Sequence, residues 1–112
     1  MLFSRSKSLT PSDAAAAVAR GELQLIDVRE SSELTEARIK GARHIPLGQL
    51  PARLSELDRD RPVAFLCRSG SRSAIATRSA AKAGLDAANV KGGMTAWARA
   101  GLPTSKQSRS AR

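Results

Sequence analysis

The chain has 112 residues, which is room for one folded domain, and its hydrophobic content of 41% is ordinary for a globular protein. Its aromatic residues are only Phe3, Phe65 and Trp97, so we expect an aliphatic, alanine-rich core. The net charge of +9 would suit nucleic-acid binding, but five basic residues lie in two serine-rich ends without acidic residues, which leaves 14 basic and 10 acidic residues between them. This distribution favours solvated basic ends on a mildly basic domain over a nucleic-acid surface, since few aromatic side chains are present to stack on bases.

The chain has a single cysteine, Cys67, which excludes an internal disulfide and fits a reducing compartment. The first seven residues are too short and too charged for a signal peptide. No apolar run approaches the length of a membrane span. We therefore expect a cytoplasmic protein without membrane association.

The first part of the chain predicts a helix followed by a buried strand. Thr10 suits an N-cap, Pro11 suits the first helical position, and Asp13 completes a capping box, so a helix is expected up to Arg20. Leu9 is assigned either to a short edge strand or to a hydrophobic contact at this cap. Residues 23–29 are apolar and β-branched and end in charged side chains, as expected of an inner strand that reaches a ligand crevice.

The middle of the chain predicts two further helices around a short strand. A helix capped by Ser31 or Ser32 is expected to run to residue 38, and residues 43–46 predict the third strand. Leucines at three- and four-residue spacing then predict one apolar stripe on a helix over residues 47–57, which Pro51 would start or kink.

The second half predicts a strand at residues 63–66, a helix at about 73–83, a strand at 88–90 and a last helix at 94–100. Strands that alternate with helices at this spacing indicate a mostly parallel sheet covered on both faces. The expected organisation is a basic serine-rich N-terminal segment over residues 1–9, one domain over residues 10–103, and a disordered basic tail over residues 104–112.

The strongest candidate site is the turn from strand to helix at residues 67–72, called the Cys67 loop below. Backbone N–H groups of such a glycine- and serine-containing loop converge on one point, and the following helix adds a positive partial charge there. Two loop arginines strengthen this field. The pattern predicts a lowered pKa for the Cys67 thiol and a nucleophilic thiolate near neutral pH. After Cys67, the loop consists of Arg68, Ser69, Gly70, Ser71 and Arg72.

Several residues around the loop have structural interpretations. Asp27 and Arg29 are expected to form an ion pair behind the loop, because buried charges need partners. Ser71 and Ser73 are expected to cap the next helix. The only histidine, His44, is interpreted as a polar residue at a strand end rather than the partner of the cysteine.

Taken in order, these motifs resemble those of the single-domain rhodaneses, a family of sulfurtransferases. The resemblance runs from about Thr10 to Pro103, and its motifs are residues 25–30 with Glu33, 41–46, 67–73, Gly92 and Gly93 with Trp97, and 101–103. It implies a three-layer α/β/α sandwich on a parallel sheet of about five strands.

The resemblance also implies a reaction. Cys67 would accept a sulfane sulfur from a thiosulfate-like donor as a persulfide, and a thiol, cyanide or a protein partner would remove it in a ping-pong cycle without metal or organic cofactor. Arg68 or Arg72 would bind the donor's sulfonate group, or Arg72 would orient the loop by pairing with Glu33 or Asp27. Ser69 would donate a hydrogen bond to the thiolate or only fill the loop.

One segment departs from the family pattern. Where the family often has Gly-His-Ile-Pro-Gly, residues 37–41 are Ala-Arg-Ile-Lys-Gly. If this segment lies near the mouth of the site, as the family fold implies, Arg38 and Lys40 add positive charge there and influence the choice of donor.

Three other functions stay open at this point. A persulfide carrier or interaction module would use Cys67 with little small-molecule turnover. A phosphatase or arsenate reductase would use the same loop, but cysteine phosphatases place five residues between Cys and Arg, whereas four separate Cys67 from Arg72, and a smaller ring suits a single sulfur atom better than a phosphoryl group. Nucleic-acid binding would use the basic ends.

Overall fold

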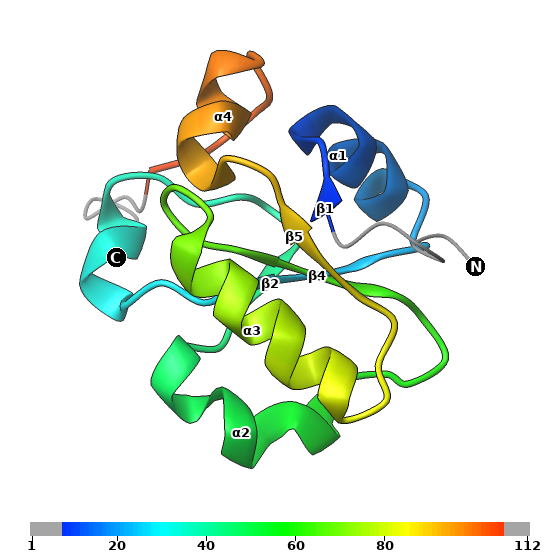
Figure 1. Cartoon of the computed structure of the whole chain (residues 1–112). Coiled ribbons are helices and arrows are strands. Elements are labelled where there is room, and N and C mark those ends of the chain that lie inside the picture. Colours follow the sequence, from blue (N-terminus) through cyan, green and yellow to red (C-terminus); the bar gives the residue numbers. More distant parts are fainter. Residues whose placement is uncertain (1–7, 107–112) are drawn as a thin grey trace.

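In the computed structural model, which describes residues 8–106, the apolar runs of the sequence form the strands of one sheet (Figure 1). All neighbouring strands pair in parallel, in the order β1-β5-β4-β2-β3. The strands are β1 (Ser8–Leu9), β2 (Gln24–Asp27), β3 (Ala42–His44), β4 (Val63–Leu66) and β5 (Ala87–Val90). The expected parallel five-stranded sheet is confirmed, and Leu9 belongs to its edge strand.

Helices cover both faces of the sheet and complete the expected α/β/α sandwich (Figure 1). α1 and α4 lie on one face, and α2 and α3 lie on the other. The helices are α1 (Pro11–Ala19), α2 (Leu50–Arg53), α3 (Ser71–Lys82) and α4 (Gly93–Arg99), and the 3-10 turns are η1 (Ser31–Thr35), η2 (Leu47–Gln49) and η3 (Leu54–Glu56).

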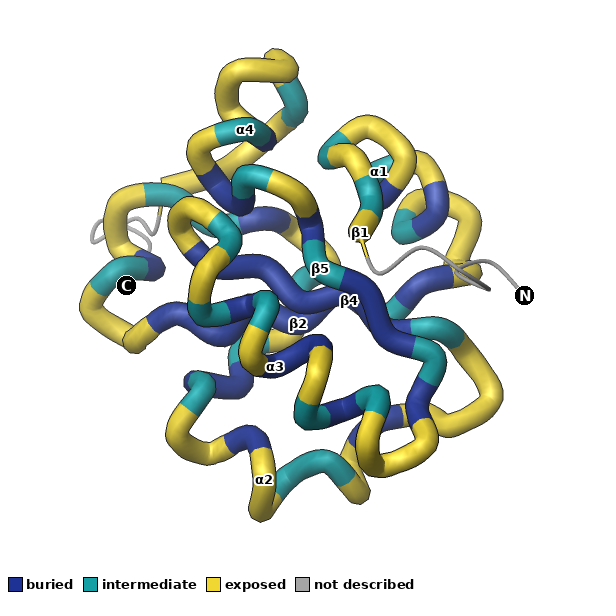
Figure 2. Tube along the Cα trace, viewed as in Figure 1, coloured by how far each residue is buried: buried dark blue, intermediate teal, exposed yellow. Residues whose placement is uncertain are grey.

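Strand alternation divides the core into two clusters. Along β4, Ala64 and Leu66 pack with α1 and α4, whereas Val63 and Phe65 pack with α2 and α3. All four residues of β4 are buried (Figure 2). Cys67 continues the alternation of Val63 and Phe65 and therefore lies on the α3 side of the sheet, within the second cluster.

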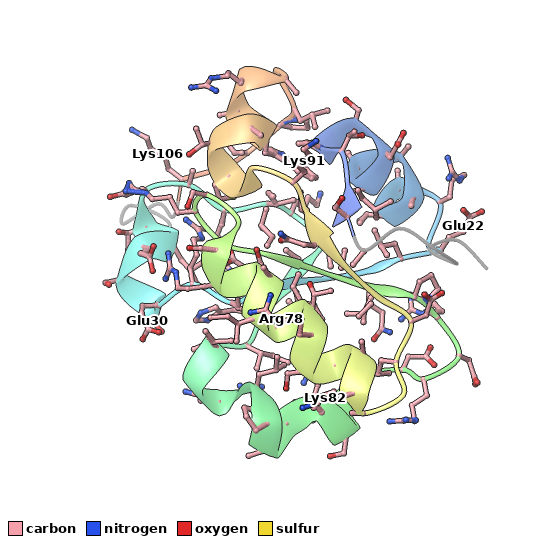
Figure 3. The ribbon with its side chains drawn as sticks, in the orientation of Figure 1. Glu22, Glu30, Arg78, Lys82, Lys91 and Lys106 are labelled. Atoms are coloured by element: carbon pink, nitrogen blue, oxygen red, sulfur yellow. The ribbon has the colours of Figure 1, made fainter. Side chains whose placement is uncertain are left out.

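Many of the charged side chains lie on the outside of this sandwich, whereas Asp27 and Arg29 are buried. Figure 3 shows Glu30 at the edge of the molecule and Arg78 and Lys82 on α3, and all three are exposed. Within residues 8–106, no helix combines the length and the apolar character needed to cross a membrane.

The helix starts agree with the sequence in one case and differ in two. The Thr10 Oγ1 accepts a hydrogen bond from the Asp13 N–H at 3.1 Å, so the predicted N-cap is confirmed. The expected helix capped by Ser31 or Ser32 is the shorter η1, and its N-cap is Glu30, whose N–H donates to Glu33 Oε2 at 2.8 Å. The Glu33 carboxylate thus reaches back to the N–H of the N-cap residue, as in a capping box, and Ser31 and Ser32 lie inside η1.

The helix expected over residues 47–57 is broken into η2, α2 and η3, with Pro51 in the first turn of α2. α3 begins at Ser71 rather than at residue 73, and its N-cap is Gly70 with φ of 112°. Ser71 and Ser73 therefore lie inside the helix, and the prediction that they cap it is wrong. Gly70 makes the sharp entry possible because this left-handed conformation disfavours residues with a Cβ atom.

The described fold continues past the expected domain boundary at Pro103. Ser105 and Arg38 exchange two backbone hydrogen bonds, each of 2.8 Å, and the Trp97 Nε1 donates to the Pro103 carbonyl at 3.0 Å. Ser105 is thus tied to the domain by its backbone, although it was expected in the disordered tail. The rest of that tail, residues 107–112, and residues 1–7 of the N-terminal segment lie outside the described residues.

The start of α4 is fastened directly to the Cys67 loop. The Met94 N–H donates to the Cys67 carbonyl at 2.8 Å, and the Thr95 N–H donates to the Arg68 carbonyl at 3.1 Å. A Cβ atom at Gly93 would lie 2.3 Å from the Cys67 carbonyl oxygen and 2.7 Å from that of Arg68. Glycine at position 93 therefore permits the start of α4 to come close enough to bind the backbone of the Cys67 loop.

We expect Gly93→Ala to lower the free energy of unfolding by about 2 kcal/mol or more, because the new Cβ displaces the Cys67 carbonyl and the residue must keep a positive φ. Urea denaturation measures the change. Gly48→Ala is the matched control, since nothing lies within 4 Å of its added Cβ and its φ is not positive, so its effect should stay within about 0.5 kcal/mol. Equal effects of the two substitutions would contradict this role of Gly93.

Candidate active site

The sulfur of Cys67 lies at the centre of hydrogen-bond donors from its own loop and from Ser73 in the first turn of α3. Cys67 follows β4 directly and is fully buried. The Gly70 N–H donates to its Sγ at 3.1 Å and the Ser73 N–H at 3.4 Å, while the Ser73 hydroxyl oxygen lies 3.3 Å from the same sulfur. The Ser69 N–H also interacts with it. The predicted ring of N–H groups is therefore present in the structure.

Hydrogen bonds to the sulfur oppose the effect of its burial. Burial raises the pKa of the Cys67 thiol, but hydrogen bonds from the Ser73 hydroxyl and from the N–H groups of Ser73, Gly70 and Ser69 together outweigh burial and hold the pKa below its ordinary value of 9.0. The N-terminus of α3 adds its positive partial charge at the same place. The direction of the shift agrees with the expectation of a reactive thiolate.

Arg72 is engaged by a carboxylate. Its Nη1 and Nη2 donate to Glu33 Oε2 at 2.7 Å and Oε1 at 2.9 Å, a bidentate pair that links α3 to η1. The Arg72 hydrogen bond is the main reason why the pKa of Glu33 falls from 4.5 to about 2; burial opposes it, and the Glu30 N–H adds to it. Of the two carboxylates that the sequence offered to Arg72, the structure selects Glu33 over Asp27.

Arg68 is the more accessible of the two loop arginines. Its side chain is 62% exposed, and within residues 8–106 its one ion pair is a 3.3 Å interaction with Glu36, itself 67% exposed. Ion pairs of this kind contribute little and rearrange easily. Arg68 also lines a small cavity of about 160 Å³ with Glu36, Met94 and Thr95. It is therefore free to meet an anion that approaches from solvent.

The predicted ion pair of Asp27 and Arg29 is confirmed. The Arg29 Nη2 donates to Asp27 Oδ2 at 2.8 Å. The side chains of Arg29 and Asp27 are only 4% and 3% exposed. Arg29 also donates to the carbonyls of Glu33 at 3.2 Å and Ala37 at 2.7 Å. The pair thus holds the backbone that carries Glu33, and Glu33 in turn holds Arg72.

His44 contacts Arg29 and not Cys67. Its Nε2 is 2.7 Å from the Arg29 carbonyl oxygen, so the interpretation of His44 as a polar residue at a strand end agrees with the structure. Within residues 8–106, no group of three or more His, Cys, Asp or Glu side chains could hold a metal ion.

Asn89 is a site residue that the sequence did not single out. Its Oδ1 accepts a hydrogen bond from the Ser73 hydroxyl at 2.5 Å, and its Nδ2 donates to the Gly70 carbonyl at 3.1 Å. The signal that could have found it is the alternation of β5: Asn89 pairs in register with Phe65, on the strand next to β4. A polar side chain at this position, beside the Cys67 loop, needs a hydrogen-bond partner, and the loop is where it can find one.

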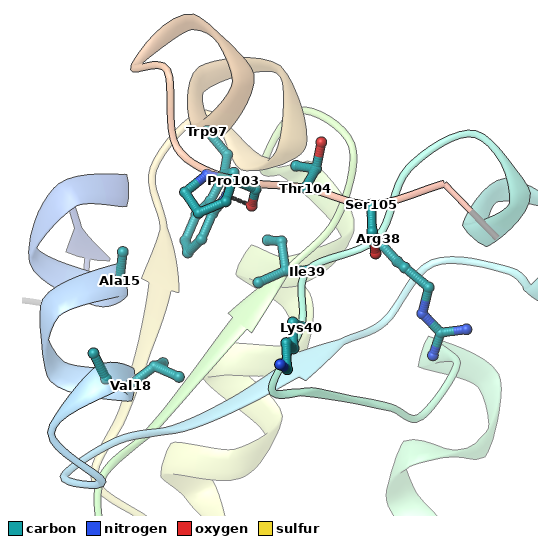
Figure 4. A pocket seen from close by; sticks show the side chains of 10 residues that line it. Ala15, Val18, Arg38, Ile39, Lys40, Trp97, Pro103, Thr104 and Ser105 are labelled. Atoms are coloured by element: carbon teal, nitrogen blue, oxygen red, sulfur yellow. Dashed lines mark hydrogen bonds between the residues drawn. The ribbon is translucent and has the colours of Figure 1, made fainter. Parts of the chain in front are cut away.

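Arg38 and Lys40 line a cavity other than the Cys67 site. They line a cavity of about 560 Å³ between α1, α4 and the C-terminal segment, together with Val18 and Trp97 (Figure 4). No residue of the Cys67 loop lines this cavity. The structure therefore gives no support for their place at the mouth of the site; the backbone of Arg38 pairs with Ser105, which lines the same cavity.

Comparisons with known proteins agree with this geometry. A family model described as "Rhodanese-like domain" matches residues 10–100. The chain is 45% identical over 76 residues to "Putative sulfurtransferase YtwF" of Bacillus subtilis, covering 68% of this chain and 74% of that protein. It is 39% identical over 83 residues to "Sulfurtransferase" of Allochromatium vinosum, covering 73% and 78%. The crystal structure of a rhodanese-related protein from Thermoplasma volcanium matches with a TM-score of 0.83 at 30% identity, covering 90% of this chain and 99% of that chain.

We expect Glu33→Gln to lower the free energy of unfolding at pH 7 by about 1–2 kcal/mol, after allowance for the partial exposure of the pair. Because the pKa of Glu33 is 4.5 without this environment and about 2 with it, the contribution of the carboxylate is complete above pH 4.5 and is lost as the pH falls through 2. The difference between wild type and variant should therefore shrink over that range in urea denaturation.

The matched control is Glu36→Gln, which removes the carboxylate of the exposed pair with Arg68. Its effect should stay within about 0.5 kcal/mol at any pH. A Glu33→Gln effect that is constant between pH 7 and pH 2 would contradict the role given to the Glu33 carboxylate.

Proposed function

Because the chain belongs to the rhodanese-like domain family, we propose that it is a sulfurtransferase that moves a sulfane sulfur from a thiosulfate-like donor to a thiol or cyanide through a persulfide on Cys67. Relatives of this chain are named as sulfurtransferases, which supports sulfur transfer in general. The observation that carries the finer proposal is the buried Cys67 sulfur surrounded by N–H donors of Ser69, Gly70 and Ser73.

The reaction follows from the chemistry of this sulfur. The Cys67 thiolate attacks the outer sulfur of thiosulfate, a bond forms between Sγ and that sulfur, and the sulfur–sulfur bond of the donor breaks with its electron pair leaving on sulfite. The product is a persulfide whose terminal sulfur is anionic. A thiolate or cyanide then attacks the terminal sulfur, and the electron pair of the broken bond returns to Cys67 as the thiolate.

The loop residues have distinct roles in this proposal. The N–H groups of Ser69, Gly70 and Ser73 stabilise negative charge on sulfur in both states of the enzyme. Arg68, exposed and weakly paired, binds the anionic oxygens of the donor. Arg72 orients the start of α3 through Glu33 and does not contact the donor.

The second half of the cycle depends on an external nucleophile. The 112 residues contain no second cysteine that could attack the persulfide. A small thiol, cyanide or the cysteine of a partner protein must therefore remove the sulfur. A reducing compartment suits this chemistry and a lone cysteine, so we place the reaction in the cytoplasm.

We expect the wild-type protein to gain about 32 Da, the mass of one sulfur atom, when it is incubated with thiosulfate and weighed intact. Added cyanide should remove this mass and yield thiocyanate. Cys67→Ser keeps a hydroxyl in place of the thiol and is expected to show neither result. A mass gain in Cys67→Ser, or none in wild type, would contradict the role of Cys67.

Two other outcomes would favour the alternative functions. Stable loading of sulfur without formation of thiocyanate would favour the persulfide carrier, and Cys67-dependent hydrolysis of an aryl phosphate would favour the phosphatase.

Arg68→Ala should raise the KM for thiosulfate by about threefold to tenfold, as expected for the loss of one exposed charge contact, and leave kcat nearly unchanged. Steady-state thiocyanate formation measures both constants. Arg78→Ala is the matched control, because Arg78 is exposed on α3 outside the Cys67 loop and carries the same charge. Equal changes in KM for the two variants would show only a general charge effect and would refute a specific contact by Arg68.

A further inference from the structure

Two contacts of Asn89 determine which way its side-chain amide points. Its Nδ2 lies 3.1 Å from the Gly70 carbonyl oxygen, and a carbonyl can only accept. The amide nitrogen must therefore face Gly70, and the amide oxygen must face Ser73. Since the Ser73 Oγ is 2.5 Å from that oxygen, which is also only an acceptor, the hydroxyl proton of Ser73 is donated to Asn89.

The same hydroxyl oxygen also lies 3.3 Å from the Cys67 sulfur. A hydroxyl has one proton, so Ser73 cannot donate to Asn89 and to a Cys67 thiolate at the same time. While its proton is held by Asn89, Ser73 presents lone pairs to the sulfur. In that orientation it can accept a hydrogen bond from the thiol, and it stabilises the thiolate only when its proton turns from Asn89 to the sulfur.

We propose that Asn89 is a positioning residue that draws the Ser73 hydroxyl proton away from the Cys67 thiolate. The backbone N–H groups of the loop remain the donors that hold the anion. Because Asn89 competes for the Ser73 proton, the thiolate of Cys67 does not receive the full stabilisation that the N–H groups and the Ser73 hydroxyl could give together. Because the nucleophilicity of a thiolate rises with its basicity, this competition keeps Cys67 reactive while the loop keeps it ionised.

A second consequence rests on the proposed function. When Cys67 carries a persulfide, its Sγ is bonded to the second sulfur and no longer bears the negative charge. The Ser73 proton can then stay with Asn89, because Sγ no longer needs a hydrogen bond from it. The pair of Ser73 and Asn89 therefore favours the sulfur-loaded form of Cys67 over the free thiolate.

The position of these groups makes the competition effective. Ser73 is fully buried, so bulk water does not offer its hydroxyl another acceptor. The charged and titratable groups of the neighbouring elements are the same in every variant described below. They are Arg72 with Glu33, Arg68 with Glu36, Asp27 with Arg29, His44 on β3, Glu30 at the start of η1, and Lys91 directly after β5.

The test measures the pKa of Cys67 in the full chain from the pH dependence of its alkylation by iodoacetamide. Asn89→Leu keeps a side chain of similar size but removes the acceptor, so the Ser73 proton becomes available to the sulfur. The pKa of Cys67 should fall by about one unit, as expected for one added hydrogen bond to a charged group. The limiting alkylation rate at high pH should fall with it, because a less basic thiolate is a weaker nucleophile. An unchanged or raised pKa would overturn the proposal.

Asn89→Leu also removes the hydrogen bond to the Gly70 carbonyl, and a second background separates the two effects. In Ser73→Ala, which has no hydroxyl proton to contest, Asn89→Leu should leave the pKa of Cys67 unchanged. The same shift in both backgrounds would show that Asn89 acts only by anchoring Gly70. If Asn89→Leu fails to unfold cooperatively in urea, Asn89→Ala removes the same acceptor without adding a branched side chain and is tested in the same two backgrounds.

Alkylation uses no sulfur donor and no acceptor. Its outcome is therefore independent of whether thiosulfate loads Cys67 in the mass measurement. A pKa shift without persulfide formation would support Asn89 and refute the proposed function, whereas persulfide formation without the shift would do the reverse.

Discussion

The site depends on one requirement, which is that a buried sulfur anion must be surrounded by hydrogen-bond donors. Cys67 is fully buried, and burial alone raises the pKa of its thiol. The Ser73 hydroxyl and the N–H groups of Ser73, Gly70 and Ser69 reverse this effect, and they reach the sulfur only if the Cys67 loop keeps its shape. The rest of the structure holds that shape from two sides. Arg29 supports Glu33, which binds Arg72, and the Met94 N–H at the start of α4 binds the Cys67 carbonyl.

The parallel sheet explains why these groups meet. β4 is central and fully buried, so the residue after its last position emerges at the C-terminal edge of the sheet, where open α/β folds form their sites. β5 lies beside it and places Asn89 next to the start of α3, and β2 lies on the other side and ends in Asp27. Three adjacent strands thus deliver the nucleophile, the residue that orients Ser73, and the ion pair behind the loop.

Local patterns of the sequence were sufficient for the strands, for the Thr10 cap and for the Cys67 loop, because each is encoded within a few consecutive residues. The pairing of Asp27 with Arg29 was also accessible, since buried charges two residues apart need each other. Groups that are defined by contacts between distant parts of the chain could not be predicted from the sequence. Ser73 was expected as a cap, yet it faces Cys67 and Asn89, and Arg38 was expected at the site, yet it pairs with Ser105. Asn89 lies 16 residues from Ser73, and only the register of β5 against β4 reveals its role.

The central claim is that backbone N–H groups of the loop hold a thiolate at Cys67. The most direct measurement is a pH titration of the backbone amide resonances of Gly70 and Ser73 by NMR. The account predicts that both signals move together with one midpoint below 9.0, the ordinary pKa of a thiol, and that the transition is absent in Cys67→Ser. A midpoint at or above 9.0, or amide signals that do not respond to ionisation of Cys67, would contradict it.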